Sequence, residues 1–205
     1  MYSGRFLAVP LLVLGLLSCQ SQKVPTLMDG DILFQDFDSP QSGAIKLATH
    51  SEWSHCGILF YDGRMPMVWE AVQPVKITPL KEWVARNDSS YFEVRRIKNR
   101  DTYLTDEVVT EMKAEGTKQL GKAYDIYFNW GDNAFYCSEY VWKIYNRAAG
   151  IEVGIRHPLR EYDLSNPTVK AIMADRYGDS IPADEMMVSP EDIFLSDLLE
   201  PVKTN

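Results

Sequence analysis

Cysteine and histidine are scarce in this chain, which has three of each among its 205 residues. So few cysteines exclude a small domain held together by a network of disulfides. Zinc sites usually contain paired ligands a few residues apart, and only the adjacent His55 and Cys56 resemble such a pair. Neighbouring residues of a strand point to opposite faces, so these two are not expected to share a ligand. We therefore expect no metal and no cofactor.

An excess of positive charge is also missing, because 29 acidic side chains outnumber 21 basic ones and the formal net charge is −8. Such a chain is not expected to bind nucleic acid or an anionic membrane face. The sequence has no internal repeat and no low-complexity tract. Its length and its 45% content of hydrophobic residues indicate one globular domain with a sizeable core.

Long apolar runs are absent except near the start of the chain. Residues 6–17 follow Arg5 and have the length and charge pattern of a secretory signal peptide, too short to span a bilayer. The sequence Leu16-Leu-Ser-Cys19 is similar to a bacterial lipobox. It predicts a lipoprotein signal peptide at 1–18 and lipid attachment to Cys19; the alternative is an ordinary signal peptide with an incidental cysteine.

This interpretation predicts how the mature protein is organised. Residues 19–27 are a tether, and residues 28–205 form the single domain. The membrane is reached only through the lipid on Cys19, because several acyl chains on one residue anchor firmly. The absence of aspartate at position 20 favours the outer membrane of the bacterial cell envelope, with the domain facing the periplasm.

Cys137 lies where a polar loop gives way to an apolar run with helical spacing. That run is predicted to form a helix over 137–149, which Gly150 ends. A thiol at a helix N-terminus lies beside unpaired backbone N–H groups and the positive end of the helix dipole, and both stabilise the thiolate. Cys137 is therefore a candidate nucleophile, although a buried cysteine that only packs in the core is the alternative.

Residues 53–61 alternate like a strand. His55 then points to one face, and Cys56 points to the other with Ile58 and Phe60. If His55 faces Cys137, we expect Cys56 to be turned away from it into the core. A disulfide between Cys56 and Cys137 is the alternative in an oxidising compartment.

Asp62-Gly63 lies between two apolar runs and predicts a hairpin turn. A turn centred there pairs residues whose numbers sum to 125, which places His55 directly opposite Glu70. A carboxylate beside an imidazole fixes its tautomer and stabilises the imidazolium, as the third member of a catalytic triad does. The alternative is that His55 and Glu70 form an ordinary cross-strand pair on a solvent-exposed face of the sheet, without a catalytic role.

Several motifs together resemble the YiiX-type permuted papain-like cysteine hydrolases of the NlpC superfamily. They cover nearly all of the mature domain and are Gly30-Asp-Ile-Leu-Phe-Gln35, His50-Ser-Glu-Trp-Ser-His-Cys-Gly-Ile58, Val68-Trp-Glu-Ala71, Gly121-Lys-Ala-Tyr-Asp125 and Tyr136-Cys-Ser-Glu139. In that family the histidine precedes the cysteine, because the order is circularly permuted. The resemblance implies Cys137 as nucleophile, His55 as general base and Glu70 as third member.

Further residues are expected around the triad, and the resemblance implies one of them. Tyr124 occupies the place of a family tyrosine that faces the substrate. Asp31, beside Gly30 near the start of a strand, is expected to shape the loop at the substrate-binding site; a solvated turn residue is the alternative. The helix-terminal N–H of Cys137 is the simplest oxyanion donor.

The expected fold is α+β: an antiparallel, barrel-like sheet with helices packed against it, in a circularly permuted papain-like arrangement. Its expected elements are strands near 31–34, 54–61, 67–72 and 91–97, and helices near 43–49, 105–120, 137–149, 167–177 and 190–199.

Three functions are compatible with these residues. The favoured one is a thiol-dependent amidase or peptidase that cleaves a small peptide or a cell-envelope amide through an acyl-enzyme thioester. The second is a lipid acyl hydrolase or acyltransferase with the same site, and the third is an inactive binding module. A long apolar tunnel favours lipid, whereas a short cleft with carboxylates placed for a free amine favours peptide.

Overall fold

The structure, a computed structural model, describes residues 26–37 and 39–202. The predicted signal peptide, the lipidation site Cys19 and most of the predicted tether lie outside the described residues. The strands are β1 (Ile32–Gln35), β2 (His55–Asp62), β3 (Met65–Glu70), β4 (Lys76–Pro79), β5 (Glu93–Ile97), β6 (Ala123–Tyr124), β7 (Ala134–Phe135), β8 (His157–Pro158), β9 (Met186–Met187) and β10 (Leu199–Pro201). The helices are α1 (Pro40–Thr49), α2 (Leu80–Val84), α3 (Arg100–Tyr103), α4 (Asp106–Thr117), α5 (Cys137–Ala149), α6 (Pro167–Tyr177) and α7 (Pro190–Phe194), with a 3-10 turn at Leu159–Glu161.

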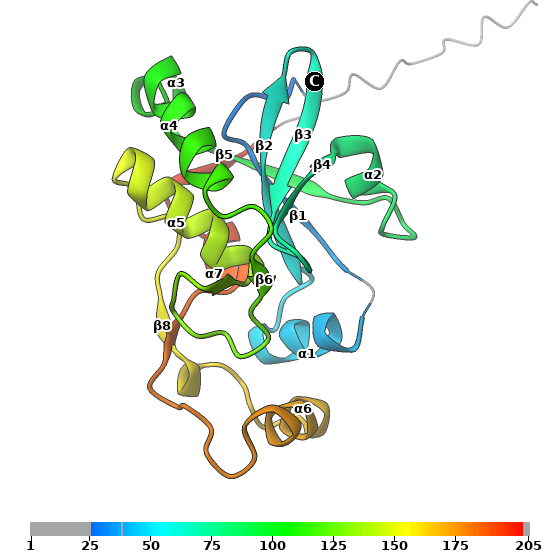
Figure 1. The fold of residues 1–205 in the computed structure, drawn as a ribbon. Coiled ribbons are helices and arrows are strands. Elements are labelled where there is room, and N and C mark those ends of the chain that lie inside the picture. Colours follow the sequence, from blue (N-terminus) through cyan, green and yellow to red (C-terminus); the bar gives the residue numbers. More distant parts are fainter. Residues whose placement is uncertain (1–25, 38, 203–205) are drawn as a thin grey trace, which may run out of the picture.

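Six strands form one antiparallel sheet in the order β10-β5-β1-β2-β3-β4. The sheet is open, with β10 and β4 at its edges, so the barrel-like closure expected from the sequence is not present in the described part of the chain. The α+β class with helices packed on an antiparallel sheet is confirmed (Figure 1).

The two faces of the sheet are buried against different helices because the apolar residues of β1 and β2 occupy both sides of each strand. Ile32, Ile58 and Phe60 belong to the larger core, which helices α4 and α5 cover. Leu33 and Leu59 belong to a smaller core with Trp83 of α2 on the opposite face. Figure 1 shows α4 and α5 on one side of the sheet and α2 on the other.

Helices α1 and α6 pack together beyond the end of the sheet where β2 begins (Figure 1). Ala44 of α1 and Val169 and Met173 of α6 form a third, separate cluster. Ser39 caps α1 and Asn166 caps α6, each by accepting a backbone N–H, and a proline follows each cap. Helices α1 and α6 lie outside the large core, and residues of both helices line a pocket beside Cys137.

The hairpin between β2 and β3 has a different register from the predicted one. Ile58 pairs with Trp69 and Tyr61 with Pro66, so paired numbers sum to 127 rather than 125. The turn contains Gly63 at its first central position, with φ of +59°, where two-residue hairpin turns favour glycine. A slip of two residues preserves the face of every side chain, so His55 and Glu70 still share a face but are diagonal neighbours.

Two of the predicted helices have the expected boundaries, and a third ends earlier than predicted. The helix at 137–149 and the helix at 167–177 are found as predicted. The helix expected at 190–199 ends at Phe194, and residues 199–201 instead add the edge strand β10 to β5. None of the helices in the described ranges is long and apolar enough to cross a membrane.

Candidate active site

Helix α5 begins at Cys137 and presents this thiol at the rim of the sheet. Tyr136 precedes the helix in extended conformation, and Gly150 ends it in the left-handed region. The first N–H groups of a helix have no intrahelical acceptor, so the backbone N–H of Cys137 is available to a ligand. Only 2% of the Cys137 residue surface is exposed. The sulfur is thus a buried thiol beside the positive end of a helix dipole.

His55, the first residue of β2, contacts both the thiol and a carboxylate. Its Nε2 lies 2.7 Å from Oε2 of Glu70, which is fully buried at the end of β3. The other ring nitrogen, Nδ1, is therefore left for the Cys137 sulfur, with which the imidazole interacts. Three residues far apart in sequence thus converge in one row of sulfur, imidazole and carboxylate. This is the arrangement in which a histidine activates a cysteine nucleophile.

Two residues that the sequence analysis did not select hold the Glu70 carboxylate. Thr78 of β4 donates its hydroxyl to Oε1 at 2.6 Å, and Arg86 forms an ion pair with the same oxygen at 2.7 Å. Arg86 also donates to the Thr78 hydroxyl at 3.0 Å. Both residues belong to segments whose place beside β3 depends on tertiary packing, and no sequence motif marks them.

The protonation states follow from these contacts. Burial alone would lower the pKa of His55, but hydrogen bonds with Cys137 and Glu70 outweigh it and raise this pKa to about 9. Burial opposes ionisation of Glu70, but the hydrogen bond with His55 and the neighbouring Thr78 and Arg86 lower its pKa to about 2. The pKa of the Cys137 thiol is held well below its ordinary value by a hydrogen bond from Cys56 and by His55. These shifts all favour an imidazolium, a thiolate and a carboxylate at neutral pH.

Cys56 corrects one sequence expectation. It is buried with Ile58 and Phe60 as predicted, but Cys137 belongs to the same core cluster, so the two thiols are neighbours rather than turned apart. Both cysteines are free and no disulfide joins them. Burial raises the pKa of the Cys56 thiol, which stays protonated and donates to the Cys137 sulfur.

Tyr124 also contacts the thiol, from the short strand β6. Its hydroxyl accepts a hydrogen bond from Nε2 of Gln41 at 3.0 Å. Gln41 is fixed in turn by Arg176, whose Nη2 donates to the amide oxygen at 2.7 Å. Burial raises the pKa of Tyr124, so the hydroxyl keeps its proton and can donate it as a hydrogen bond toward Cys137. The tyrosine expected to face the substrate is thus beside the nucleophile.

Gly30 and Asp31 lie elsewhere. Asp31 immediately precedes β1 and pairs with Leu59, whereas the triad lies at the other end of this strand, where Gln35 pairs with His55. The Asp31 carboxylate accepts two hydrogen bonds from Arg96, at 2.6 and 2.7 Å, and one from the Met28 N–H at 2.8 Å. Gly30 and Asp31 therefore attach the start of the domain to β2 and to Arg96, at the end of β1 away from the triad.

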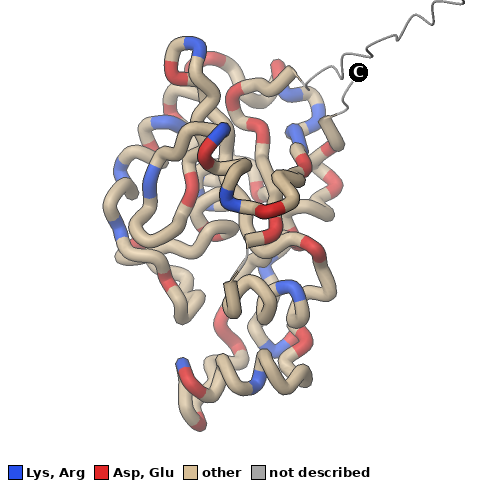
Figure 2. The backbone as a smooth tube through the Cα atoms, turned by 90° about the vertical axis from the view of Figure 1, so that its right-hand side faces the viewer, with Lys and Arg blue, Asp and Glu red and all other residues tan. Residues whose placement is uncertain are grey.

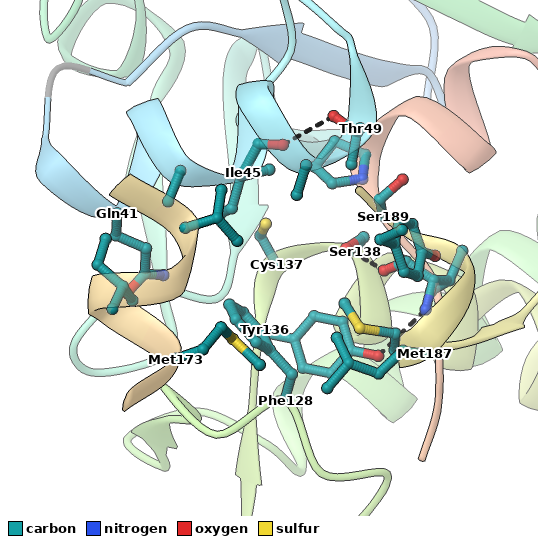
Figure 3. A pocket seen from close by; sticks show the side chains of 18 of the residues that line it. Gln41, Ile45, Thr49, Phe128, Tyr136, Cys137, Ser138, Met173, Met187 and Ser189 are labelled. Atoms are coloured by element: carbon teal, nitrogen blue, oxygen red, sulfur yellow. Dashed lines mark hydrogen bonds between the residues drawn. The ribbon is translucent and has the colours of Figure 1, made fainter. Parts of the chain in front are cut away.

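An apolar pocket opens beside Cys137 between α1 and α6. About 660 Å³ in this region is not occupied by protein atoms, and part of that space is open to solvent. Figure 3 shows the Cys137 side chain pointing into this space, with Ile45 on one side and Tyr136, Phe128 and Met173 on the other. Further apolar residues complete its wall: Ala44, Ala48, Leu159, Leu164, Val169, Ile172, Met187, Val188 and Pro190.

The few polar groups of the pocket wall are already paired. Ser138 donates to the carbonyl of Val188, and Thr49 donates to the carbonyl of Ile45. No aspartate or glutamate of the described chain lines this pocket. Most of the wall is apolar, and the guanidinium of Arg176 donates hydrogen bonds to Gln41 and to the carbonyl of Ile126, so the space suits an aliphatic or aromatic group better than a hydrated one.

The comparisons with known proteins agree with this geometry. A family described as "Permuted papain-like amidase enzyme, YaeF/YiiX, C92 family" matches residues 26–203. The uncharacterised protein YiiX of Escherichia coli strain K12 is 46% identical over 165 residues, which are 80% of this chain and 80% of that protein. A crystal structure described as metalloprotein YiiX from Escherichia coli O157:H7 superposes with a TM-score of 0.82 at 44% identity and covers 87% of this chain and 97% of that one.

Both the family match and the 46% identity extend over most of the domain that carries the row of sulfur, imidazole and carboxylate. At the level of class, this supports a thiol hydrolase of the amidase or peptidase type. The chain belongs to the YaeF/YiiX family of permuted papain-like amidases.

Proposed function

We propose that this protein is a thiol-dependent amidase that removes an apolar acyl group from an amide through a thioester on Cys137. The observation that carries the proposal is the position of the Cys137 sulfur, which contacts His55 and points into an almost wholly apolar pocket. An acyl chain in this pocket would bring its carbonyl carbon to the sulfur. Each buried methylene would add roughly 0.8 kcal/mol to binding.

The reaction would proceed in two steps. In acylation, the Cys137 thiolate attacks the carbonyl carbon and the C=O π electrons move to oxygen. The tetrahedral intermediate collapses as His55 donates its proton to the leaving nitrogen and the C–N bond breaks. In deacylation, neutral His55 takes a proton from water, the hydroxide attacks the thioester and the thiolate leaves. Glu70 stays ionised throughout, because its pKa of about 2 lies far below neutral pH.

The oxyanion would receive two hydrogen bonds. One comes from the backbone N–H of Cys137 at the start of α5. The second is supplied by the Tyr124 hydroxyl, because the contact from Gln41 occupies its oxygen and leaves its proton free to point at the reacting atoms. Tyr124 is thus our candidate for the second oxyanion donor.

Tyr124→Phe tests this role. We expect kcat to fall about 10-fold to 100-fold with little change in KM, since the lost hydrogen bond strengthens in the transition state. Steady-state kinetics on one amide substrate separates the two parameters. Tyr127→Phe is the matched control, because this exposed tyrosine does not line the apolar pocket. An increase in KM with unchanged kcat would assign Tyr124 to substrate binding instead.

The size of the acyl group can be tested with fluorogenic coumarin amides of chain length C2 to C16. We expect kcat/KM to rise roughly 2-fold to 4-fold per methylene until the pocket is full. Ala48→Phe places a ring in the pocket, so it should lower the rate on the C16 amide at least about 10-fold and leave the C2 amide within about 2-fold. Ala174→Phe, on the exposed side of α6, is the control. A flat dependence on chain length would exclude an acyl pocket.

Ester-linked acyl lipids are the second candidate substrates, because the same pocket and thiol would accept their acyl chains. Matched amides and esters with one acyl group separate the two bond types. The apolar lining does not favour the free amine of a peptide on the acyl side, since no described carboxylate faces the pocket. The lipid anchor predicted at Cys19 would hold the domain at a membrane, where acyl substrates are found; this location is part of the proposal.

The related structure from Escherichia coli is described as a metalloprotein. In the described residues of this chain, no group of three or more His, Cys, Asp or Glu side chains is arranged to hold a metal ion. The donor set therefore does not fit a metal site here, and the proposed reaction has no step through a metal.

A further inference from the structure

A second, open cleft lies on the other side of the catalytic residues. About 1340 Å³ in this region, including space open to solvent, is free of protein atoms, and the cleft is bounded by His55 and by the segment around Lys76. Gln41, Ile45 and Tyr124 line both this cleft and the apolar pocket, so they separate the two spaces. A substrate whose acyl chain fills the pocket and whose carbonyl reaches Cys137 would extend its amine side into the cleft.

The charges of this cleft differ from those of the whole protein. Besides the catalytic His55, its lining includes two cations, Lys76 and Arg86, and no aspartate or glutamate from the described residues. The chain as a whole carries 29 acidic and 21 basic side chains. Figure 2 shows both signs interspersed along the backbone rather than gathered in one basic region. A cleft whose charged lining residues all carry positive charge is thus a local feature of the site.

Only one of the two cations is free to bind a ligand. Arg86 already pairs with the buried Glu70 at 2.7 Å and donates to Thr78 at 3.0 Å, so its charge is balanced. Lys76 is exposed and forms no ion pair within the described part of the chain. It stands opposite Glu70 in the pairing of β3 with β4 and, by strand alternation, points to the same face as Thr78.

We propose that the cleft recognises an anionic group on the amine side of the scissile bond, and that Lys76 determines this specificity. The substrate class is then an N-acyl amide with an apolar acyl chain and a carboxylate or phosphate on the released amine. This inference rests on the proposed function and adds the chemistry of the second half of the substrate. An ammonium at the cleft attracts either anion, and the attraction is screened by salt.

Two matched pairs of substrates test the proposal and distinguish the two anions. N-palmitoylglycine is compared with N-palmitoylglycinamide, and N-palmitoylphosphoethanolamine with N-palmitoylethanolamine. We expect kcat/KM to be about 5-fold to 10-fold higher for the charged member of at least one pair at low salt, and this preference to shrink at high salt. The pair with the larger preference identifies the anion as carboxylate or phosphate.

Variants of Lys76 assign the preference to this residue. Lys76→Gln should reduce the preference to about 1, and Lys76→Glu should make the neutral member the better substrate. Lys81→Gln is the matched control, because this exposed lysine of α2 does not line the cleft and should keep the parent preference. Equal rates within both pairs for the parent enzyme, or a preference that survives Lys76→Gln, would overturn the inference.

Binding separates failure of this inference from failure of the proposed function. Isothermal titration calorimetry with the Cys137→Ala protein measures whether N-palmitoylglycine binds more tightly than the glycinamide without any turnover. Absence of hydrolysis and of acylated Cys137 for all four substrates would contradict the proposed function. Turnover or binding without a charge preference would contradict only the inference that the cleft recognises an anion, and would leave the proposed function standing.

Discussion

Cys137→Ala is expected to lower amide hydrolysis at least about 10⁴-fold, because it removes the sulfur that contacts His55 and attacks the carbonyl in the proposed reaction. The serine variant should lose nearly as much, since a hydroxyl beside this imidazole has no thiolate to offer. Removing one sulfur from the buried start of α5 should leave the fold intact, as circular dichroism and thermal unfolding can check. Hydrolysis of a long-chain coumarin amide measures the effect.

Cys56→Ser provides the matched control for this experiment. Cys56 is the other free thiol of the described chain, is fully buried and donates a hydrogen bond to the Cys137 sulfur. A serine hydroxyl can replace that donor, so we expect less than about a 10-fold loss, the cost of weakening one hydrogen bond. If Cys56→Ser removed activity and Cys137→Ala preserved it, the two thiols would have to exchange roles.

Glu70→Gln is expected to lower kcat/KM about 10²-fold to 10⁴-fold and to change its pH profile. In the parent protein, acylation requires protonated His55, so activity should fall as pH rises through about 9. Glutamine has the shape of glutamate but no charge to stabilise the imidazolium. With one of the two partners that oppose burial lost, the pKa of His55 should fall below that of the parent, so the alkaline limb should move to lower pH. A kcat/KM profile from pH 5 to 11 measures this shift.

Thr78→Val is the graded control for Glu70. It removes the hydroxyl that donates to Glu70 at 2.6 Å but keeps the carboxylate, the ion pair with Arg86 and the shape of the side chain. We expect a loss of about 10-fold and a smaller shift of the same limb. If Glu70→Gln left the alkaline limb near pH 9, Glu70 would not be the group that sustains the charge of His55.

The sequence predicts the parts of this site that depend on local patterns. The helix at 137–149 was predicted correctly because an apolar face with helical spacing begins at Cys137 and a glycine follows its last turn. Strand alternation also identified the shared face of His55 and Glu70. That conclusion survived an error of two residues in hairpin register, because a slip of two residues leaves every side chain on its own face.

The parts that were missed depend on contacts between distant segments. Arg86 reaches Glu70 from the end of α2, and Arg176 of α6 fixes the Gln41 that orients Tyr124. The proximity of Cys56 to Cys137 depends on how α5 packs on the sheet, which alternation within one strand does not determine. The assignment of Asp31 to the site was wrong because a motif next to a strand does not reveal at which end of the strand the site lies.

The rate of alkylation of Cys137 by iodoacetamide, followed by peptide mass spectrometry across pH, tests most directly whether His55 holds this cysteine as a thiolate. We predict that Cys137 reacts much faster than Cys56 at pH 7, that its rate stays high well below the ordinary pKa of a thiol, and that His55→Ala slows it at least about 10-fold. Equal, slow labelling of both cysteines, unchanged by His55→Ala, would contradict the account.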